Sequence, residues 1–264
     1  MFSLLKLKKY KTVIAQILFI AAFVIFWQTY AIKRDIMGFP TLNEIFKSLF
    51  ESVGDPNRRI LTYLGYSLLA ILKGLGLGMV FALIFSGLSA ISKTFMAIYN
   101  LVVSIFDLLP GVALLPILMI TIGANDTAIL ILVIHSVVWP MSRNIIDGFK
   151  TTPQIYIESG KNIGLSIFRL VFDVYIPASF ANTLSGIKVG WARAWRGLIS
   201  AEMIFGAAQS AGIGVYINNA RTVWIDYAGV YAAIVLIIIV GIIVEYGVFQ
   251  VIEKQTVRKW GMVR

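Results

Sequence analysis

The chain has 264 residues, of which 59% are hydrophobic and only 14% are charged, and its mean hydropathy is +0.85. Soluble domains average about 25% charged residues, so this composition excludes an ordinary soluble protein and predicts an all-α protein that crosses the membrane several times. The absence of cysteine and the single histidine exclude a disulfide framework and a Cys/His metal cluster. The net charge of +10 comes mostly from basic residues beside apolar runs, so it indicates lipid head groups and membrane topology rather than a nucleic acid partner.

Long apolar runs predict about six membrane-spanning helices. They are Val13–Ile32, Ile60–Leu88, Phe95–Ile122, Thr127–Phe149, Pro177–Phe205 and Tyr227–Ile252. The first run follows LKLKKYK, as in a signal peptide, but it is long enough to cross a bilayer. The residues after it, Lys33, Arg34 and Asp35, contain no cleavage signature. We therefore expect an uncleaved first span.

The segment between the first two spans has the pattern of a short amphipathic helix. Pro40 and Thr41 are typical of a helix start. One helical face then collects the apolar residues Leu42, Ile45, Phe46, Leu49 and Phe50. We expect this helix to lie on the membrane surface. In the third span, Pro110 and Pro116 predict a break or a kink.

The distribution of Lys and Arg predicts the orientation of the chain. With the N-terminus inside, the inner loops and both ends receive most of the basic residues, so both termini are expected in the cytoplasm. This topology makes residues 151–176 the longest inner loop. We find no internal repeat and no soluble segment at either end. We therefore expect residues 1–264 to form one transmembrane domain.

The inner loop reads PQIYIESGKNIGLSIFRLVFDVYIP and is half polar. Thr151 or Thr152 can cap a helix whose first turn contains Pro153. This helix should run to about Ile163, and Gly164 fits the left-handed position that ends a helix.

A second short helix should follow in the same loop. Ser166 can cap a helix over Ile167–Tyr175, and Pro177 then opens the fifth span. The result is a helix–glycine–helix elbow on the inner face. Its first helix carries apolar and polar residues side by side: Ile155, Ile157, Ile163, Glu158, Lys161 and Asn162. Periodicity leaves two interpretations open, a helix that docks in a partner's groove and an amphipathic connector that rests on lipid.

The spacing of the loop resembles the EAA motif of ABC-importer permeases, which is E-A-A, three residues, G, nine residues, and I-x-L-P. In motif order, the matching residues are Glu158, Ser159, Gly160, Gly164, Val174, Ile176 and Pro177. The Glu, Gly and Pro positions agree with the motif, whereas the two Ala positions and two apolar positions carry substitutions.

Other segments are similar to one branch of these permeases, the branch for nitrate, sulfonate, taurine and related solutes. They are RAWRGLISAEMIFG, GIGVYI, IEKQTVRKWGM and LLPGVALLPILMITIG. The resemblance covers Pro40 to Met262, and Asp107 is a residue that it does not lead us to expect.

The resemblance implies the assembly in which the chain works. Two permease copies, expected as a homodimer, form the translocation path in the lipid bilayer. Two ATPase subunits bind ATP and Mg²⁺, so this chain needs no cofactor of its own, and an extracytoplasmic binding protein delivers a small polar or anionic solute. The loop would be the coupling helix, with Glu158, Ser159, Gly160, Gly164 and Pro177 contacting or positioning the ATPase. The small residues Ser159 and Gly160 would allow a close approach to the partner.

Motifs for chemistry within the chain are weak. GLSAISKT, from Gly87 to Thr94, nearly matches a phosphate-binding loop, but Ser92 replaces its second Gly and no strand precedes it. The chain has no H-E-x-x-H and no G-x-S-x-G motif, and its lone His135 is expected to be a packed or pore-facing polar residue. We therefore expect no enzymatic activity in this chain.

Charged residues within the predicted spans are the remaining candidates for function, because charges rarely face lipid. The candidate residues of a translocation path are Asp107, Arg193, Trp195, Arg196 and Glu202. One interpretation is that the arginines of two copies attract an anionic solute. The other is that an arginine pairs with Glu202, Glu245 or Asp107 and holds spans together. A third alternative is an ion-gradient-driven transporter or channel in which these carboxylates carry protons.

Overall fold

The computed structural model describes residues 2–34, 36, 38–55, 58–206 and 211–262. All regular elements of these residues are helical, which confirms the predicted all-α class. The α-helices are α1 (Phe2–Arg34), α2 (Leu42–Gly54), α3 (Ile60–Ile91), α4 (Lys93–Leu108), α5 (Leu115–Thr121), α6 (Asp126–Lys150), α7 (Gln154–Asn162), α8 (Ile167–Arg169), α9 (Ile176–Ala178), α10 (Phe180–Phe205), α11 (Ile213–Thr222), α12 (Tyr227–Ile242) and α13 (Gln250–Glu253). A 3₁₀ turn, η1 (Gly111–Leu114), and three π-helical segments, η2 (Leu170–Tyr175), η4 (Ile243–Phe249) and η5 (Lys254–Arg258), complete the described elements.

The described residues contain four helices long and apolar enough to cross a membrane, and two bent helix pairs that pass the same test together. The four helices are Lys11–Arg34, Ile60–Ile91, Asp126–Lys150 and Tyr227–Arg258. The two pairs are Lys93–Leu108 with Gly111–Thr121, and Ile167–Ala178 with Phe180–Phe205. These helices give four to six candidate spans, and the predicted number of about six is reached if each bent pair counts as one broken span.

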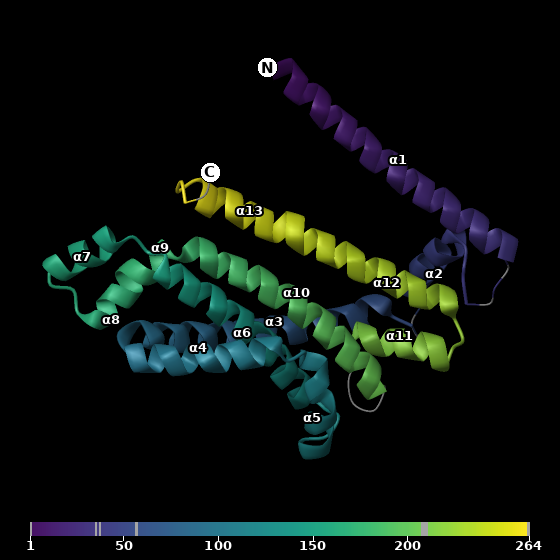
Figure 1. Cartoon of the computed structure of the whole chain (residues 1–264). Helices are drawn as coiled ribbons and strands as arrows, with labels where there is room; N and C mark the ends of the chain where they lie inside the picture. The colour runs from purple at the N-terminus through teal and green to yellow at the C-terminus, as the bar shows by residue number, and fades with distance from the viewer. Residues whose placement is uncertain (1, 35, 37, 56–57, 207–210, 263–264) are drawn as a thin grey trace.

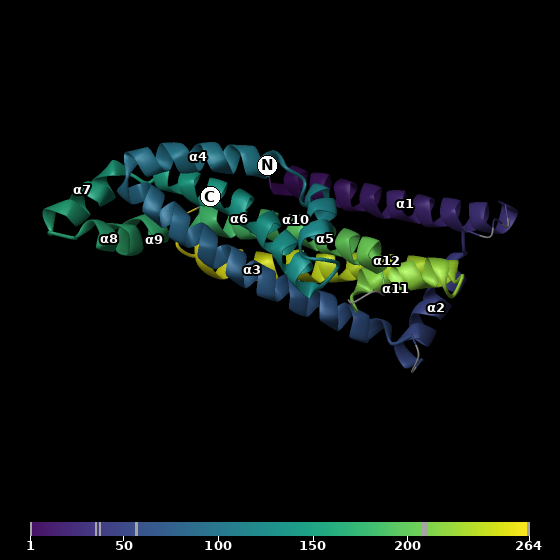
Figure 2. The same ribbon diagram turned by 90° about the horizontal axis from the view of Figure 1, so that it is seen from below.

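Helix α6 lies at the centre of the bundle, between α3 and α10 (Figures 1 and 2). Gly74 and Gly78 of α3 face Val133 and Val137 of α6 so closely that a Cβ on Gly74 would lie 2.3 Å from Val133 Cγ1. Gly190 of α10 also faces Val137, where an added Cβ would lie 3.4 Å from Val137 Cα and Cγ1. Small residues at these positions let the helix backbones approach one another closely.

The third span is broken at the first of its two prolines. Helix α4 ends at Leu108, and the chain turns by 89° before Gly111–Thr121. Pro110 lies in the extended residues at the turn, whereas Pro116 occupies the first turn of α5, where a proline is tolerated. The predicted break in the span Phe95–Ile122 is therefore confirmed, and it lies at Pro110.

Helix α2 begins where the sequence predicts. The Thr41 hydroxyl accepts from the Glu44 amide, while the Thr41 amide and hydroxyl donate to the Glu44 carboxylate. These hydrogen bonds hold the pKa of Glu44 below its ordinary value. Ile45 is buried, with α2 packed on α12, whereas Phe46 and Phe50 remain exposed. Only part of the predicted apolar face therefore packs within the chain.

Different helices lie at the two ends of the bundle. The elbow formed by α7 and α8 lies at one end together with the C-terminal segment, and α2 and α11 lie at the other (Figures 1 and 2). Helix α1 stands away from the bundle and is anchored near its C-terminal end, where the Trp27 ring stacks on Phe39 and its indole N–H donates to Pro40 O at 3.1 Å.

Candidate functional site

The start of the elbow differs from the predicted threonine cap. Thr151 is the C-cap of α6, and its hydroxyl donates to Asp147 O at 3.0 Å. The Thr152 hydroxyl donates to Gly148 O at 3.1 Å. Pro153 occupies the N-cap position of α7 without a side-chain hydrogen bond. The prediction of a threonine N-cap is wrong because both hydroxyls bind carbonyls of the preceding helix instead.

The turn after α7 has the predicted geometry. Gly164 has φ +78°, the left-handed conformation that glycine adopts without strain. The Gly164 amide donates to Lys161 O at 3.0 Å, and the Leu165 amide donates to Gly160 O at 3.0 Å. This pair of bonds is the Schellman arrangement that closes a helix C-terminus. Ser166 then accepts from the Arg169 amide at 3.4 Å, which confirms it as the cap of the second helix.

The second arm of the elbow is longer than predicted. Helical turns continue from Ile167 through the π-helical segment η2 to Ala178. The chain then bends by 72° at Ser179, before α10 begins at Phe180. Pro177 lies within this second arm, in α9, whereas α10 begins at Phe180, so Pro177 does not open the fifth span.

Both arms of the elbow carry large apolar side chains that are exposed. Ile155, Ile163, Phe168 and Phe172 are 63%, 77%, 61% and 67% exposed. Glu158 and Ser159 are also exposed.

Gly160, by contrast, faces into the elbow. It is buried against the chain's own second arm, where a Cβ would lie 2.7 Å from Leu170 Cδ2. Its small size therefore serves contact between the two arms, whereas Ser159 lies on the free surface.

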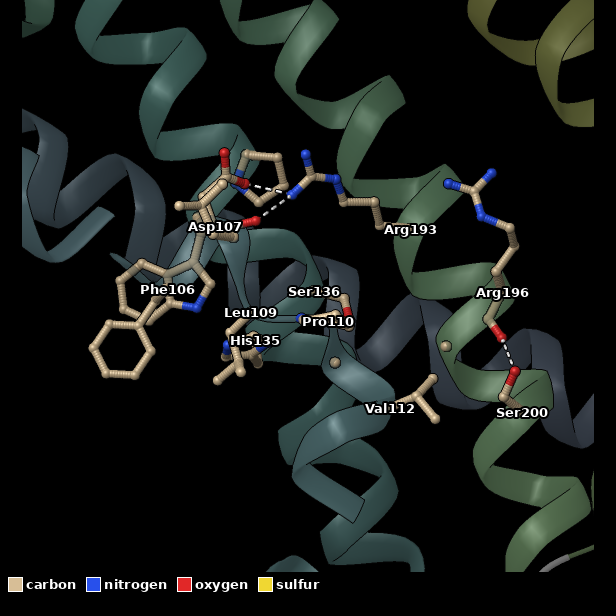
Figure 3. Close-up of a pocket in the computed structure, with 15 residues that line it drawn as sticks. Phe106, Asp107, Leu109, Pro110, Val112, His135, Ser136, Arg193, Arg196 and Ser200 are labelled. Carbon is tan, nitrogen blue, oxygen red and sulfur yellow. Dashed lines mark hydrogen bonds and ion pairs between the residues drawn. The ribbon is translucent and has the colours of Figure 1, made fainter. Parts of the chain in front are cut away.

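A cavity of about 330 Å³ lies beside the break in the third span (Figure 3). It is lined by the turn between α4 and η1, by α6 and by α10. Its polar and charged lining side chains are Asp107, His135, Ser136, Trp139, Arg193, Arg196 and Ser200. Arg193 and Arg196 line the cavity from α10. They are three residues apart and both exposed, whereas the opposite side of α10 packs in the core.

Asp107 joins three helices at this cavity. Its Oδ2 accepts from Arg143 Nε of α6 at 2.8 Å, and its Oδ1 pairs with Arg193 Nη1 of α10. The same Arg193 nitrogen also donates to the Asp107 main-chain oxygen at 3.2 Å. The Asp107 side chain is only 10% exposed. The structure thus contains the arginine–aspartate pair of the second interpretation, with Arg143 as an additional partner.

Arg196 differs from Arg193 although both line the cavity. In Figure 3 the Arg193 guanidinium points to Asp107, whereas that of Arg196 extends apart from it. Among the residues that the structure describes, the Arg196 guanidinium has no ion-pair or hydrogen-bond partner; only its main-chain oxygen accepts, from Ser200 Oγ at 3.0 Å.

The other two candidate path residues lie elsewhere. Trp195 is buried in the core, stacked on Trp191 with ring centroids 5.9 Å apart. Glu202 is 2% exposed and accepts from Ser67 Oγ at 2.7 and 2.9 Å and from the Gly214 amide at 2.9 Å. Its partners are therefore a hydroxyl and the first turn of α11 rather than an arginine.

Sequence reasoning missed Arg143 and Ser136 as neighbours of the path. Arg143 lies inside the predicted fourth span, so a charge in an apolar run was the available signal. Ser136 gave no such signal, because a serine carries no charge and an apolar helix accommodates it readily. In the structure its hydroxyl donates to Leu132 O of the same helix.

The near-match to a phosphate-binding loop has a different structure. Its residues form the end of α3, a cap in which Ser92 accepts from the Phe95 amide at 3.3 Å, and the start of α4. It therefore lacks the strand–loop–helix context of a nucleotide site. No group of three or more acidic or histidine side chains within the described ranges is placed to hold a metal ion.

Comparisons with known proteins bear on this site. Residues 74–258 match a protein family whose description is "Binding-protein-dependent transport system inner membrane component". The chain is 24% identical over 185 residues to the taurine transport system permease protein TauC of Escherichia coli (strain K12), which covers 70% of this chain and 66% of that protein.

Two further proteins show a similar degree of identity. A putative aliphatic sulfonates transport permease protein, SsuC of Bacillus subtilis (strain 168), is 24% identical over 66% of this chain and 60% of its own length. The nitrate import permease protein NrtB of Synechocystis sp. is 26% identical over 46% of this chain and 44% of its own length. The matches therefore span less than two thirds of each of these proteins.

Proposed function

Because this chain belongs to the family of binding-protein-dependent transport system inner membrane components, we propose that it is the permease subunit of an ATP-driven importer. The observation that carries the proposal is the elbow. A short helix that ends at a left-handed glycine and a second, capped segment connect two spans. Both arms carry exposed apolar side chains, and Glu158 on the first arm is exposed as well. Such a surface fits a groove on a partner protein. Family membership also favours this function over an ion-gradient-driven transporter or channel.

The partners follow from this role. Two ATPase subunits bind ATP and Mg²⁺ and contact the elbow through Glu158 and Ser159, while Gly160, Gly164 and Pro177 maintain its shape. A binding protein delivers the solute from outside. Residues 1–264 act as one transmembrane domain, with the loop 151–176 as the coupling segment, and need no nucleic acid partner and no cofactor of their own.

The orientation places the elbow and both termini in the cytoplasm. The basic residues of the inner loops support this side. The position of the elbow and the C-terminal segment at the same end of the bundle is consistent with it (Figure 1).

The solute path runs along the cavity beside the broken third span. Arg193 and Arg196 lie near the middle of α10 and are both exposed. Charges at this depth do not face lipid, so a second copy of the chain encloses them in a wet path. Two guanidiniums and one carboxylate line the cavity in each copy, which gives it a net positive charge and favours a small anionic solute.

The test replaces Gly164 with Val in the chain reconstituted in vesicles with its ATPase and binding protein. A side chain at φ +78° strains the turn, so the elbow tilts while the spans still insert. We expect uptake to fall by at least about tenfold, because a misplacement of about 1 Å can reduce a rate by roughly a hundredfold. ATP hydrolysis should continue but lose its stimulation by the solute-loaded binding protein.

The matched control is Gly65→Val, since Gly65 is exposed on α3 with no atom within 4 Å of its added Cβ and no positive φ. This variant should transport normally. Wild-type uptake and stimulated hydrolysis in Gly164→Val would contradict the coupling role of the elbow.

A further inference from the structure

His135, the single histidine of the chain, lies on α6 beside the cavity at the broken third span. Both of its ring nitrogens are buried and have no hydrogen-bond partner among the described residues. The indole nitrogen of Trp139, four residues further along the same helix, is buried and unpaired in the same way. Burying polar atoms without partners costs stability, so two such side chains next to a cavity call for an explanation.

Residues on both sides of the break in the third span cover His135. Before the break, the Phe106 ring stacks on Trp139 with centroids 4.9 Å apart and meets the His135 ring edge-on at 6.3 Å. After the break, Gly111 lies so close that an added Cβ would be 4.0 Å from His135 Nδ1. The chain turns by 89° between the helix that carries Phe106 and the segment that carries Gly111. A change in this angle would shift the two residues relative to each other, so they could not both keep covering His135.

We propose that His135 is a residue of the solute path that is covered in this conformation and becomes exposed when the angle of the broken third span changes. This inference rests on the proposed permease function and adds a residue to its path. In Figure 3, His135 and Phe106 lie on the side of the cavity away from Arg196. An exposed imidazole offers one donor and one acceptor when neutral, and Trp139 adds an indole N–H. A few polar groups of this kind fix the orientation of a bound solute.

Asp107 connects this cover to the charged side of the cavity. It directly follows Phe106, and its carboxylate pairs with Arg143 of α6 and with Arg193 of α10. These ion pairs hold the end of α4 against both helices. A movement of α4 that takes Phe106 off His135 therefore stretches or breaks them, so the same step that uncovers the imidazole also frees Arg193 for the path.

The experiment uses the single histidine as its own reporter. Diethyl pyrocarbonate modifies accessible imidazoles, and mass spectrometry gives the rate of modification at His135. The sample is the chain assembled with its ATPase in lipid nanodiscs, without nucleotide and after trapping with ATP and vanadate. A minor conformation is populated at about 0.1–10%, so the two conditions should differ at least about tenfold in rate when trapping changes the dominant conformation. Equal rates in both conditions would overturn the inference.

Phe106→Ala removes the cover directly. In the purified full-length chain without nucleotide, His135 of this variant should react at least about tenfold faster than in the wild type, since the population that exposes it is no longer a minor one. Ile105→Ala is the matched control, because Ile105 precedes Phe106 on α4, is 57% exposed and does not line the cavity. It should react at the wild-type rate. A wild-type rate in a folded Phe106→Ala variant would contradict the role of Phe106 as the cover.

A second variant keeps the test decisive if Phe106→Ala does not fold. His135→Leu removes the unpaired polar atoms, so it should raise the Tm in detergent by about 2–4 °C. In the reconstituted importer it should also reduce the stimulation of ATP hydrolysis by the solute-loaded binding protein. A lower Tm, or unchanged stimulation, would overturn the inference, because His135 would then serve the fold alone. These outcomes concern His135, whereas the proposed permease function fails if Gly164→Val leaves uptake and hydrolysis coupled.

Discussion

Glu202 illustrates how a single carboxylate can be buried in a membrane protein without an arginine. Its oxygens accept from Ser67 of α3 and from the Gly214 amide of α11, and Ser67 Oγ in turn accepts from the Ile213 amide at 2.8 Å. A carboxylate at the first turn of a helix also interacts favourably with the helix dipole. Glu202 therefore fixes α11 to the end of α10 rather than lining the cavity.

The Glu202→Gln variant tests this role. The amide replaces one oxygen with an NH₂ group that faces hydrogen-bond donors, so we expect a loss of about 1–3 kcal/mol in the free energy of unfolding. Thermal unfolding in detergent measures the loss, and hydrogen exchange at Ile213 and Gly214 should accelerate. Glu51→Gln is the control, because Glu51 is 63% exposed; it should change stability by less than about 0.5 kcal/mol.

A double variant tests whether Arg196 and Glu202 interact directly. Because Glu202 has no arginine partner, the double variant Arg196→Gln, Glu202→Gln should show the sum of the two single effects on stability. Partial recovery of stability in the double variant would instead indicate a direct pair.

At the scale of elements, the contact between α3 and α6 limits which residues the bundle accepts. Gly74 and Gly78 lie against Val133 and Val137, while Gly76 of the same helix has no atom within 4 Å of an added Cβ. The three glycines look alike in GLGLG, but only two face the central helix. Helical spacing of four residues predicts this pair, and the packed structure identifies its partner.

Gly74→Ala should therefore destabilise the protein, because the new methyl group overlaps Val133. Overpacking of this kind costs about 1–3 kcal/mol, which thermal unfolding in detergent will measure. Gly76→Ala on the same helix should be neutral or slightly stabilising, since alanine favours a helix more than glycine does. Equal stability of the two variants would contradict the close approach of α3 and α6.

At the scale of the whole molecule, the face around the cavity requires a partner. Leu108, Leu109 and Val112 line the cavity together with the exposed Arg193 and Arg196, and they are 81%, 36% and 36% exposed. An apolar face alone suits lipid, but a face with guanidiniums near mid-span does not. The proposed homodimer buries this face and leaves the arginines on a shared aqueous path.

Cysteine cross-linking tests the homodimer directly, because the chain has no cysteine of its own. Leu108→Cys should form a cross-linked dimer in native membranes when a mild oxidant or a short bis-maleimide is added. Leu72→Cys is the control, since Leu72 is 58% exposed on α3, away from the cavity lining. A dimer band of equal strength from both positions, or none from Leu108→Cys, would contradict this interface.

What the sequence by itself determined is mostly local. The helical class, the apolar spans, the Thr41 cap, the break at Pro110 and the left-handed turn at Gly164 all depend on residues within a few positions of one another. Predictions were wrong where one residue pattern is compatible with two local structures. The threonines before Pro153 donate to carbonyls of the preceding helix instead of capping the next one, and Pro177 lies inside a short helix instead of starting a span.

The tertiary structure alone decided which charges meet. Asp107 and Arg193 are 86 residues apart in the sequence, and Ser67 and Glu202 are 135 apart. Whether such residues touch depends on the rotation and depth of each helix, which packing of small residues at Gly74, Gly78 and Gly190 sets. The sequence therefore predicted that charges in the spans need partners, and the packing of α4, α6 and α10 selected Arg143 and Arg193 for Asp107 while leaving Arg196 unpaired within the described residues.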